Sequence, residues 1–185
     1  MSVVDDLVTA YRHRVALPWR DNLSPAERVW IAVYPPEQER RLRARLDLFQ
    51  LETEKAGHGW EVVDLTDAFG RWLDAHEYRD AFLGEPELLT AGPLADFESG
   101  VVATVRAALD AAGSAETAVV ALLGTGALYP FLRASRVIEA VESAVRGRLL
   151  VLFPGSLDGT TYRLLNARDG WNYRAIPITP MKDAP

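Results

Sequence analysis

The sequence of 185 residues contains no cysteine and only three histidines. The lack of cysteine excludes disulfide bonds, thiolate zinc sites and cysteine nucleophiles, and so few histidines limit other metal chemistry. The sequence also lacks any apolar run near the roughly 18 residues of a membrane helix, and its first residues do not resemble a signal peptide. We therefore expect a cytoplasmic protein that makes no membrane contact.

The sequence also has fewer basic than acidic side chains. The 20 lysines and arginines are outnumbered by 26 aspartates and glutamates, which gives a formal net charge of −6. Proteins held on DNA by phosphate contacts usually carry a basic surface, so this charge does not indicate a general nucleic-acid-binding protein. Residues 1–128 hold 12 basic and 21 acidic side chains, whereas residues 129–185 hold 8 and 5. The basic C-terminal part could meet an acidic partner, or the difference could be ordinary scatter of surface charge.

Apolar, β-branched runs alternate with amphipathic segments along the chain. The runs predict buried strands at residues 29–34, 60–65, 117–124 and 148–155. A strand, a turn at Arg168-Asp169-Gly170 and another strand follow. No linker divides the chain, so we predict a single α/β domain over residues 1–185. Its predicted form is a three-layer sandwich with a mainly parallel central sheet, Rossmann-like or P-loop-like without the motif, and a C-terminal hairpin.

The segments between the runs have the spacing of helices with one buried face. We expect helices at residues 3–16 and 37–57, one that starts at the N-cap Thr66, one at residues 94–112 that ends at Gly113, and one directly after Gly126. Residues 84–93 are rich in glycine, proline and glutamate and predict a loop.

In a doubly wound sheet, ligands bind where the loops after the strands gather at one edge. Here these loops are Tyr34-Pro35-Pro36, Gly124-Thr125-Gly126 and Pro154-Gly155-Ser156. If the strand order is the common 2-1-3-4-5, the first two loops flank the switch point. This edge is therefore where a ligand site is expected, if the chain has one.

The glycines of Gly124-Thr125-Gly126 do not complete a phosphate-binding motif. A phosphate loop continues into lysine and serine or threonine, but Gly126 is followed by Ala127-Leu128. A dinucleotide fingerprint needs a small residue where Tyr129 stands. We predict a tight strand-to-helix turn and keep nucleotide or small-molecule binding as the alternative.

Catalytic residues are not apparent either. Ser135 and Ser156 have no histidine pattern beside them, and the sequence holds no G-x-S-x-G motif. His76 lies on the apolar face of a predicted helix, and Asp64 and Asp67 bracket the start of that helix, where negative charge is favourable. We therefore expect no enzyme activity, no metal and no cofactor, and rank a nuclease or hydrolase last among the functions.

Three segments carry a resemblance to a known family: VVALLGTGALYPFLRASRVIEAV, GRLLVLFPGSLDGTTYRLL and WNYRAIPI. They resemble the BrxB family of bacteriophage-exclusion (BREX) defence systems, and the match is specific over about the last 70 residues. The N-terminal half is similar to that family in organisation only. The matching positions are Gly124, Gly126, Pro130, Phe131, Arg133, Phe153, Pro154, Gly155, Gly159, Arg163 and Leu164.

The resemblance implies a bacterial, non-enzymatic component of an antiviral defence system that acts through protein–protein interaction. Its implied direct partner is PglZ, the alkaline-phosphatase-like component, with the methyltransferase PglX and the ATPase BrxC in the same system. The alternative is a nucleotide or small-molecule sensor that uses the strand-end loops.

The candidate face for a partner or ligand comes from the same segments. It comprises Gly124, Thr125, Gly126, Tyr129, Arg133, Arg136, Pro154, Gly155, Asp158, Tyr162 and Arg163. Arginine and tyrosine are favoured interface anchors, whereas the glycines and Pro154 shape loops. Alternatively, Arg133 and Arg163 form an internal ion pair with Asp158.

Overall fold

The computed structural model of the chain describes residues 2–112, 116–165, 167 and 170–180. Its sheet contains β1 (Val29–Tyr34), β2 (Gly59–Asp64), β3 (Ala118–Leu123), β4 (Arg148–Asp158) and β7 (Ile176–Ile178) in the order β2-β3-β4-β1-β7. These neighbours pair in parallel, whereas β4 pairs antiparallel with β5 (Thr161–Leu164) and β5 with β6 (Trp171–Asn172). The predicted α/β class is confirmed, with a mixed sheet.

The expected strand order 2-1-3-4-5 is wrong, because β4 lies between β3 and β1. Every residue of β4 from Arg148 to Gly155 is buried, as are all residues of β1 and β3, so these three strands occupy the centre. β2 alternates exposed with partly or fully buried residues and forms an edge. The degree of burial that each strand needs thus decides its place in the sheet.

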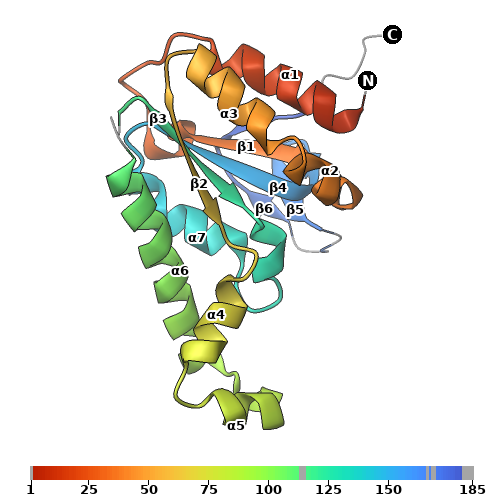
Figure 1. Cartoon of the computed structure of the whole chain (residues 1–185), viewed down its shortest axis with the longest axis vertical. Helices are drawn as coiled ribbons and strands as arrows, with labels where there is room; N and C mark the ends of the chain where they lie inside the picture. The colour runs from red at the N-terminus through yellow and green to blue at the C-terminus, as the bar shows by residue number, and fades with distance from the viewer. Residues whose placement is uncertain (1, 113–115, 166, 168–169, 181–185) are drawn as a thin grey trace.

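One face of the sheet is covered by α1 (Val3–Val15), α2 (Glu39–Arg43) and α3 (Leu46–Lys55), as Figure 1 shows. Leu7, Tyr11 and Phe49 from these helices pack with Trp30 and Leu150 of the sheet in one apolar cluster. The helix expected at residues 37–57 is interrupted: α2 ends at Arg43, and α3 starts at Leu46. The helix expected at residues 3–16 is confirmed.

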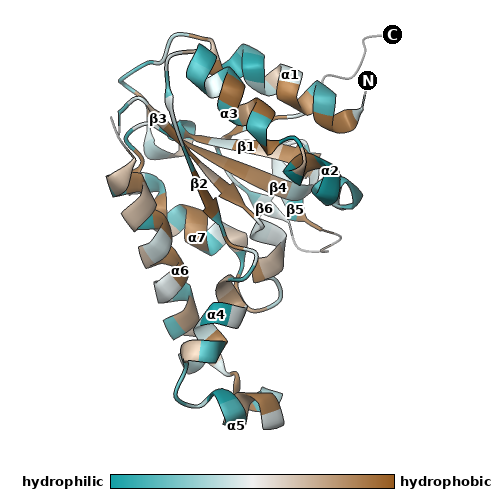
Figure 2. Cartoon of the chain, in the orientation of Figure 1, coloured by the Kyte–Doolittle hydropathy of each residue, from teal (hydrophilic) through white to brown (hydrophobic). Residues whose placement is uncertain are grey.

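The other face is covered by α4 (Ala68–Ala75), α6 (Ala91–Ala111) and α7 (Ala134–Val141) (Figure 1). Val101 and Val105 of α6 and Ile138 of α7 pack with Val120 and Val151 in a second apolar cluster. Helix α5 (Arg79–Gly84) follows α4 and lies at the end of the molecule furthest from the sheet (Figure 1). The helices of the two faces thus surround a sheet that is apolar on both sides, which Figure 2 shows in brown.

Several connections differ from the sequence predictions. The loop expected at residues 84–93 contains the 3-10 helix η3 (Pro86–Leu88), and the helix expected directly after Gly126 is replaced by the short η4 (Thr125–Leu128), with α7 starting at Ala134. Pro130 cannot donate a helical hydrogen bond, which accounts for this interruption. The remaining 3-10 helices are η1 (Pro25–Arg28), η2 (Pro36–Gln38) and η5 (Glu142–Ala144).

The C-terminal segment divides between two places. β5 and β6 form an antiparallel pair, whereas β7 leaves them and extends the sheet in parallel beside β1, where Ile178 is buried. Gly113 and the residues Arg168 and Asp169 of the expected turn lie outside the described residues. Among the described residues, no helix is both long and apolar enough to span a membrane.

Candidate functional site

The carboxyl ends of β1, β2, β3 and β4 meet at one edge of the sheet, which we call the strand-end edge. Tyr34 at the end of β1 pairs in register with Pro154, and Asp64 at the end of β2 pairs with Leu123. A cavity of about 260 Å³ opens there, lined by Pro36, Glu39, Arg43, Thr66, Gly124, Gly126, Ala127, Pro154 and Leu165. This is the position at which doubly wound α/β proteins commonly bind ligands.

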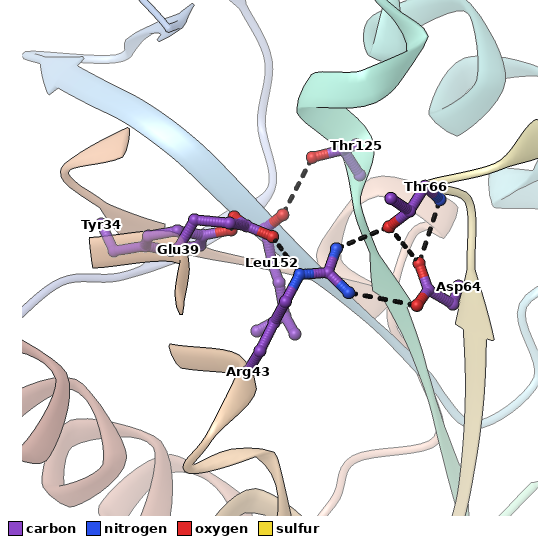
Figure 3. A network of polar contacts seen from close by, with 7 residues as sticks. All are labelled: Tyr34, Glu39, Arg43, Asp64, Thr66, Thr125 and Leu152. Carbon is purple, nitrogen blue, oxygen red and sulfur yellow. Dashed lines mark hydrogen bonds and ion pairs between the residues drawn. The ribbon is translucent and has the colours of Figure 1, made fainter. Parts of the chain in front are cut away.

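A polar network around Arg43 occupies this edge (Figure 3). The Arg43 guanidinium donates from Nε to Glu39 Oε1 over 2.8 Å, from Nη1 to Asp64 Oδ2 over 3.1 Å and from Nη2 to Thr66 Oγ1 over 2.6 Å. The other oxygen of Glu39 accepts a hydrogen bond from the Tyr34 hydroxyl. The network therefore ties helix α2 to the ends of β1 and β2.

The protonation states of the network follow from these contacts. Partial burial raises the pKa of Asp64, but hydrogen bonds from the Thr66 hydroxyl and amide and the ion pair with Arg43 outweigh it, so the pKa lies below its ordinary value. Burial and the hydrogen bond to Glu39 raise the pKa of the Tyr34 hydroxyl, which stays protonated. The Asp64 carboxylate and the Arg43 guanidinium are thus charged and paired at neutral pH.

The paired charges limit what this edge can do. A phosphate group needs free donors, yet the donors of Arg43 described above already face oxygen atoms of this chain. The described residues contain no group of three or more histidines, aspartates or glutamates that could hold a metal ion. The Arg43 network thus holds α2 against the ends of β1 and β2 and offers no free charge to a ligand.

Gly124-Thr125-Gly126 is the tight turn that the sequence predicts. Gly124 has φ +75°, and a Cβ there would lie 2.4 Å from Thr66 Oγ1 and 3.1 Å from Asp64 Oδ1. The buried Thr125 donates its hydroxyl to the Leu152 carbonyl of β4 over 2.9 Å (Figure 3). Gly124 is required by backbone conformation and by close packing against the Arg43 network, which is a structural reason for a glycine there.

The predicted face is divided among several places. Gly124, Thr125, Gly126 and Pro154 lie at the strand-end edge, Tyr129, Arg133 and Tyr162 line a second cavity, Arg136 lines a groove beside that cavity, and Gly155, Asp158 and Arg163 lie in the β4–β5 hairpin. The second cavity has a volume of about 340 Å³ and is also lined by Phe153, Leu164 and Trp171. The sequence segments with the resemblance therefore do not form one compact site.

Tyr162, a residue of the predicted face, is buried. Its ring is buried in the second apolar cluster between Phe153 and Trp171, each with a ring centroid 5.9 Å away. Burial raises its pKa to about 12. Tyr129, in contrast, is 58% exposed and lies at the rim of the same cavity. Of the two tyrosines, Tyr129 alone is placed to contact a partner.

The remaining predicted residues have individual surroundings. Arg136 forms an ion pair with Glu98 of α6 over 2.9 Å. A Cβ at Gly155 would lie 2.0 Å from the Arg163 carbonyl oxygen, so this glycine permits the close approach of β4 and β5. Asp158 is opposite Thr161 and Arg163 is opposite Ser156, which places Asp158 and Arg163 on the same face of the β4–β5 hairpin. An ion pair of Asp158 with Arg163 or Arg133 stays a prediction.

A groove of about 710 Å³ adjoins the second cavity. It runs between the start of α6 and the segment before α7, and its lining is Ala91, Leu94, Ala95, Glu98, Pro130, Phe131, Leu132, Arg133, Ser135 and Arg136. Arg133 and Ser135 line both the groove and the cavity. We call this continuous surface, with Tyr129 and Trp171, the grooved face.

Sequence reasoning missed the Arg43 network. The sequence predicts only a helix over the segment that holds Glu39 and Arg43, and only a favourable charge before a helix at Asp64. The four-residue spacing of Glu39 and Arg43 was a visible signal for one ion pair. Nothing in the sequence indicated that Asp64 and Thr66, more than 20 residues later, complete it.

Comparison with known proteins agrees with the resemblance read from the sequence. Residues 90–178 match the family model described as BREX protein BrxB. The matched region starts at α6, ends at β7 and includes all the residues of the predicted face. Searches of curated proteins and of solved structures gave no match.

Proposed function

We propose that this chain, which is identified as a BrxB-family member over residues 90–178, acts in a BREX-type phage-defence system as a non-catalytic adaptor. Its role would be to hold a partner enzyme in place. The proposed direct partner is a PglZ-like protein of the alkaline-phosphatase superfamily, with PglX and BrxC in the same system. DNA would be reached only through that complex.

The single observation that carries this proposal is the grooved face. It lies within the BrxB-matched region and combines a long groove, a cavity and the 58% exposed ring of Tyr129. Tyrosine, tryptophan and arginine are enriched at the centres of protein interfaces. Trp171 is held in position by a hydrogen bond from its Nε1 to Glu139 over 2.8 Å and by stacking on Tyr173 at 4.3 Å. A preorganised aromatic surface of this kind favours binding.

The strand-end edge also supports the adaptor function, because its paired charges disfavour nucleotide binding there. A nucleotide phosphate at Gly124 would have to displace the ion pairs that Arg43 makes with Glu39 and Asp64. Breaking partly buried charge pairs leaves two carboxylates facing the phosphate, which is electrostatically unfavourable. This favours the adaptor over a nucleotide sensor at that edge.

A small-molecule sensor stays the second candidate because of the cavity under Tyr129. Its volume of about 340 Å³ is within the range of ligand pockets, and it is walled mainly by aromatic and apolar side chains. A ligand there would raise the melting temperature, and the stabilisation would grow with the logarithm of one plus the ratio of ligand concentration to Kd. A metabolite screen by thermal shift, with Tyr129→Ala as the comparison variant, tests this function.

The adaptor function is tested with a purified PglZ-like protein from the same organism. We expect a complex in sizing chromatography and a saturable calorimetric titration. Tyr129→Ala and Arg133→Glu should each weaken it by about 30-fold, which corresponds to a hot spot of about 2 kcal/mol. Arg12→Glu, at an exposed position on α1, serves as the charge-matched control and should bind like wild type. Absence of any complex with wild type would contradict the proposal.

A further inference from the structure

An arm extends from the sheet at one end of the molecule. It consists of α4, α5, η3 and the first two turns of α6, residues 68–98, and in Figure 1 it runs downward from the strands with α5 at its far end. We call residues 77–88 the arm tip. Within it Phe82 alone is buried, and all the other residues are exposed. The arm tip contributes little to the apolar cores on the two faces of the sheet. Core packing therefore does not explain why the arm extends so far from the sheet.

The arm tip displays large apolar side chains to solvent. Tyr78 is 58% exposed, Leu83 is 62% exposed and Leu88 is 41% exposed. Figure 2 shows the hydrophobic residues on α5 at this outer end. Single exposed apolar residues are ordinary, but three within 11 residues of a projecting element indicate a contact surface.

The same arm concentrates the negative charge of the chain. Residues 68–98 contain seven acidic side chains and two basic ones, Arg71 and Arg79, a balance of −5 against a formal net charge of −6 for all 185 residues. Arg79 is already paired with Asp74 and Asp80. Glu77, Glu85 and Glu87 form no ion pair with any residue in the part of the chain that the structure describes. Apolar side chains at the tip are thus surrounded by uncompensated carboxylates.

Aromatic packing holds the arm in a defined orientation. Phe69 at its base stacks on Phe131 with ring centroids 3.7 Å apart, and Trp72 packs between Phe97 and Phe82. Trp72 also donates from Nε1 to Asp96 over 2.9 Å, which joins α4 to α6. An arm fixed in this way presents its tip with little conformational entropy left to lose on binding.

We infer that the arm tip is a docking surface for a partner protein that offers an apolar pocket with lysine and arginine at its rim. The inference rests on the proposed adaptor function and adds a second contact region to it. The start of α6 belongs both to the arm and to the lining of the grooved face, so one partner can span the two. Charge complementarity selects a basic partner surface and rejects an acidic one. Residues 68–89 precede the BrxB match, so this contact is an addition to the family region.

The test uses the full chain and the PglZ-like protein from the same system, titrated by calorimetry at low and at moderate salt. Leu83→Gln removes an apolar side chain from the arm tip, and Leu17→Gln is the matched control, because Leu17 is 53% exposed outside the arm. We expect affinity to fall at least tenfold for Leu83→Gln and to stay unchanged for Leu17→Gln. Glu85→Lys combined with Glu87→Lys should also weaken binding and reduce its salt dependence.

The outcomes separate the inference from the function on which it rests. No binding by wild type would refute the adaptor function and remove the basis of the inference. Binding by wild type that both arm variants retain would refute the inference while the adaptor function stands. Self-association of the isolated chain that Leu83→Gln abolishes would assign the arm to a second copy and also overturn the inference. Circular dichroism and thermal melting of each variant would show that the fold is retained.

Discussion

The strand-end edge and the arm use charged residues in opposite ways. At the edge, Arg43 is enclosed by two carboxylates and a threonine, and the glycine beside it has no room for a side chain. In the arm, carboxylates without ion-pair partners in the described structure surround exposed apolar side chains. At the place where α/β folds often bind ligands, the charged groups around Arg43 are thus paired within the chain, whereas the arm leaves carboxylates free to meet a partner. The two regions thus differ in whether their charged side chains are paired within the chain.

The largest expected effect on stability is at Gly124 of the strand-end edge, and Gly70 of the arm is its comparison. Gly124→Ala places a Cβ in a left-handed backbone position against Thr66, so we expect the free energy of unfolding to fall by about 3 kcal/mol. Gly70→Ala in α4 meets no atom within 4 Å and should raise it by about 0.5 kcal/mol. Urea denaturation measures both. A Gly124→Ala protein as stable as wild type would contradict the packing described for the edge.

The next effect compares the two paired arginines. Arg43→Met leaves Glu39 and Asp64 without their cation and should lower the free energy of unfolding by about 1 kcal/mol, a small value because the network is partly exposed. Arg79→Met removes the exposed pairs with Asp74 and Asp80 and should lower the free energy of unfolding less than Arg43→Met does. If the two variants lost the same free energy of unfolding in parallel urea titrations, the Arg43 network would stabilise the fold no more than the exposed pairs of Arg79.

Acid should weaken the edge through Asp64. Its pKa is lower in the folded chain than the ordinary value of 3.8, so its contribution to stability is present above that value and is lost as the pH falls through the folded pKa. Asp64→Asn should therefore reduce stability at pH 7 and show a shallower loss between pH 5 and about pH 3. Thermal melts of wild type and variant across this range measure the difference. Identical slopes would mean that Asp64 is not held by the network.

The smallest expected effect on stability comes from the arm tip. Glu85→Lys combined with Glu87→Lys changes the charge of the chain by four units, yet both side chains are exposed and without ion-pair partners among the described residues. We expect the free energy of unfolding to change by less than about 0.5 kcal/mol, because surface substitutions away from structural contacts are nearly neutral. A loss above about 1 kcal/mol in the same titrations would show that these glutamates stabilise the fold.

The sequence predicts the elements of this molecule better than their arrangement. The apolar runs that form β1, β3 and β4 are local signals, and so is the glycine pair at Gly124 and Gly126. The position of β4 between β3 and β1 depends on the relative burial of whole strands, which no short pattern records. The Arg43 network joins Glu39 to Thr66 across a helix and a strand, so its members become neighbours only in the fold.

The arm shows a second limit of the sequence. Its composition of glycine, proline and glutamate predicts a loop over residues 84–93, and the structure places η3 and the start of α6 there. The packing of Trp72 against Phe97 and Phe82 gives this polar segment an ordered backbone. Aromatic contacts between α4, α5 and α6 therefore override local preferences, as tertiary packing often does.

The adaptor function is tested most directly by calorimetric titration of the full chain with the proposed partner, a PglZ-like protein, together with sizing chromatography of the mixture. The account predicts a saturable complex that Tyr129→Ala weakens by about 30-fold and Arg12→Glu leaves intact. Titrations that show no heat and no co-elution for the folded wild-type protein would contradict it.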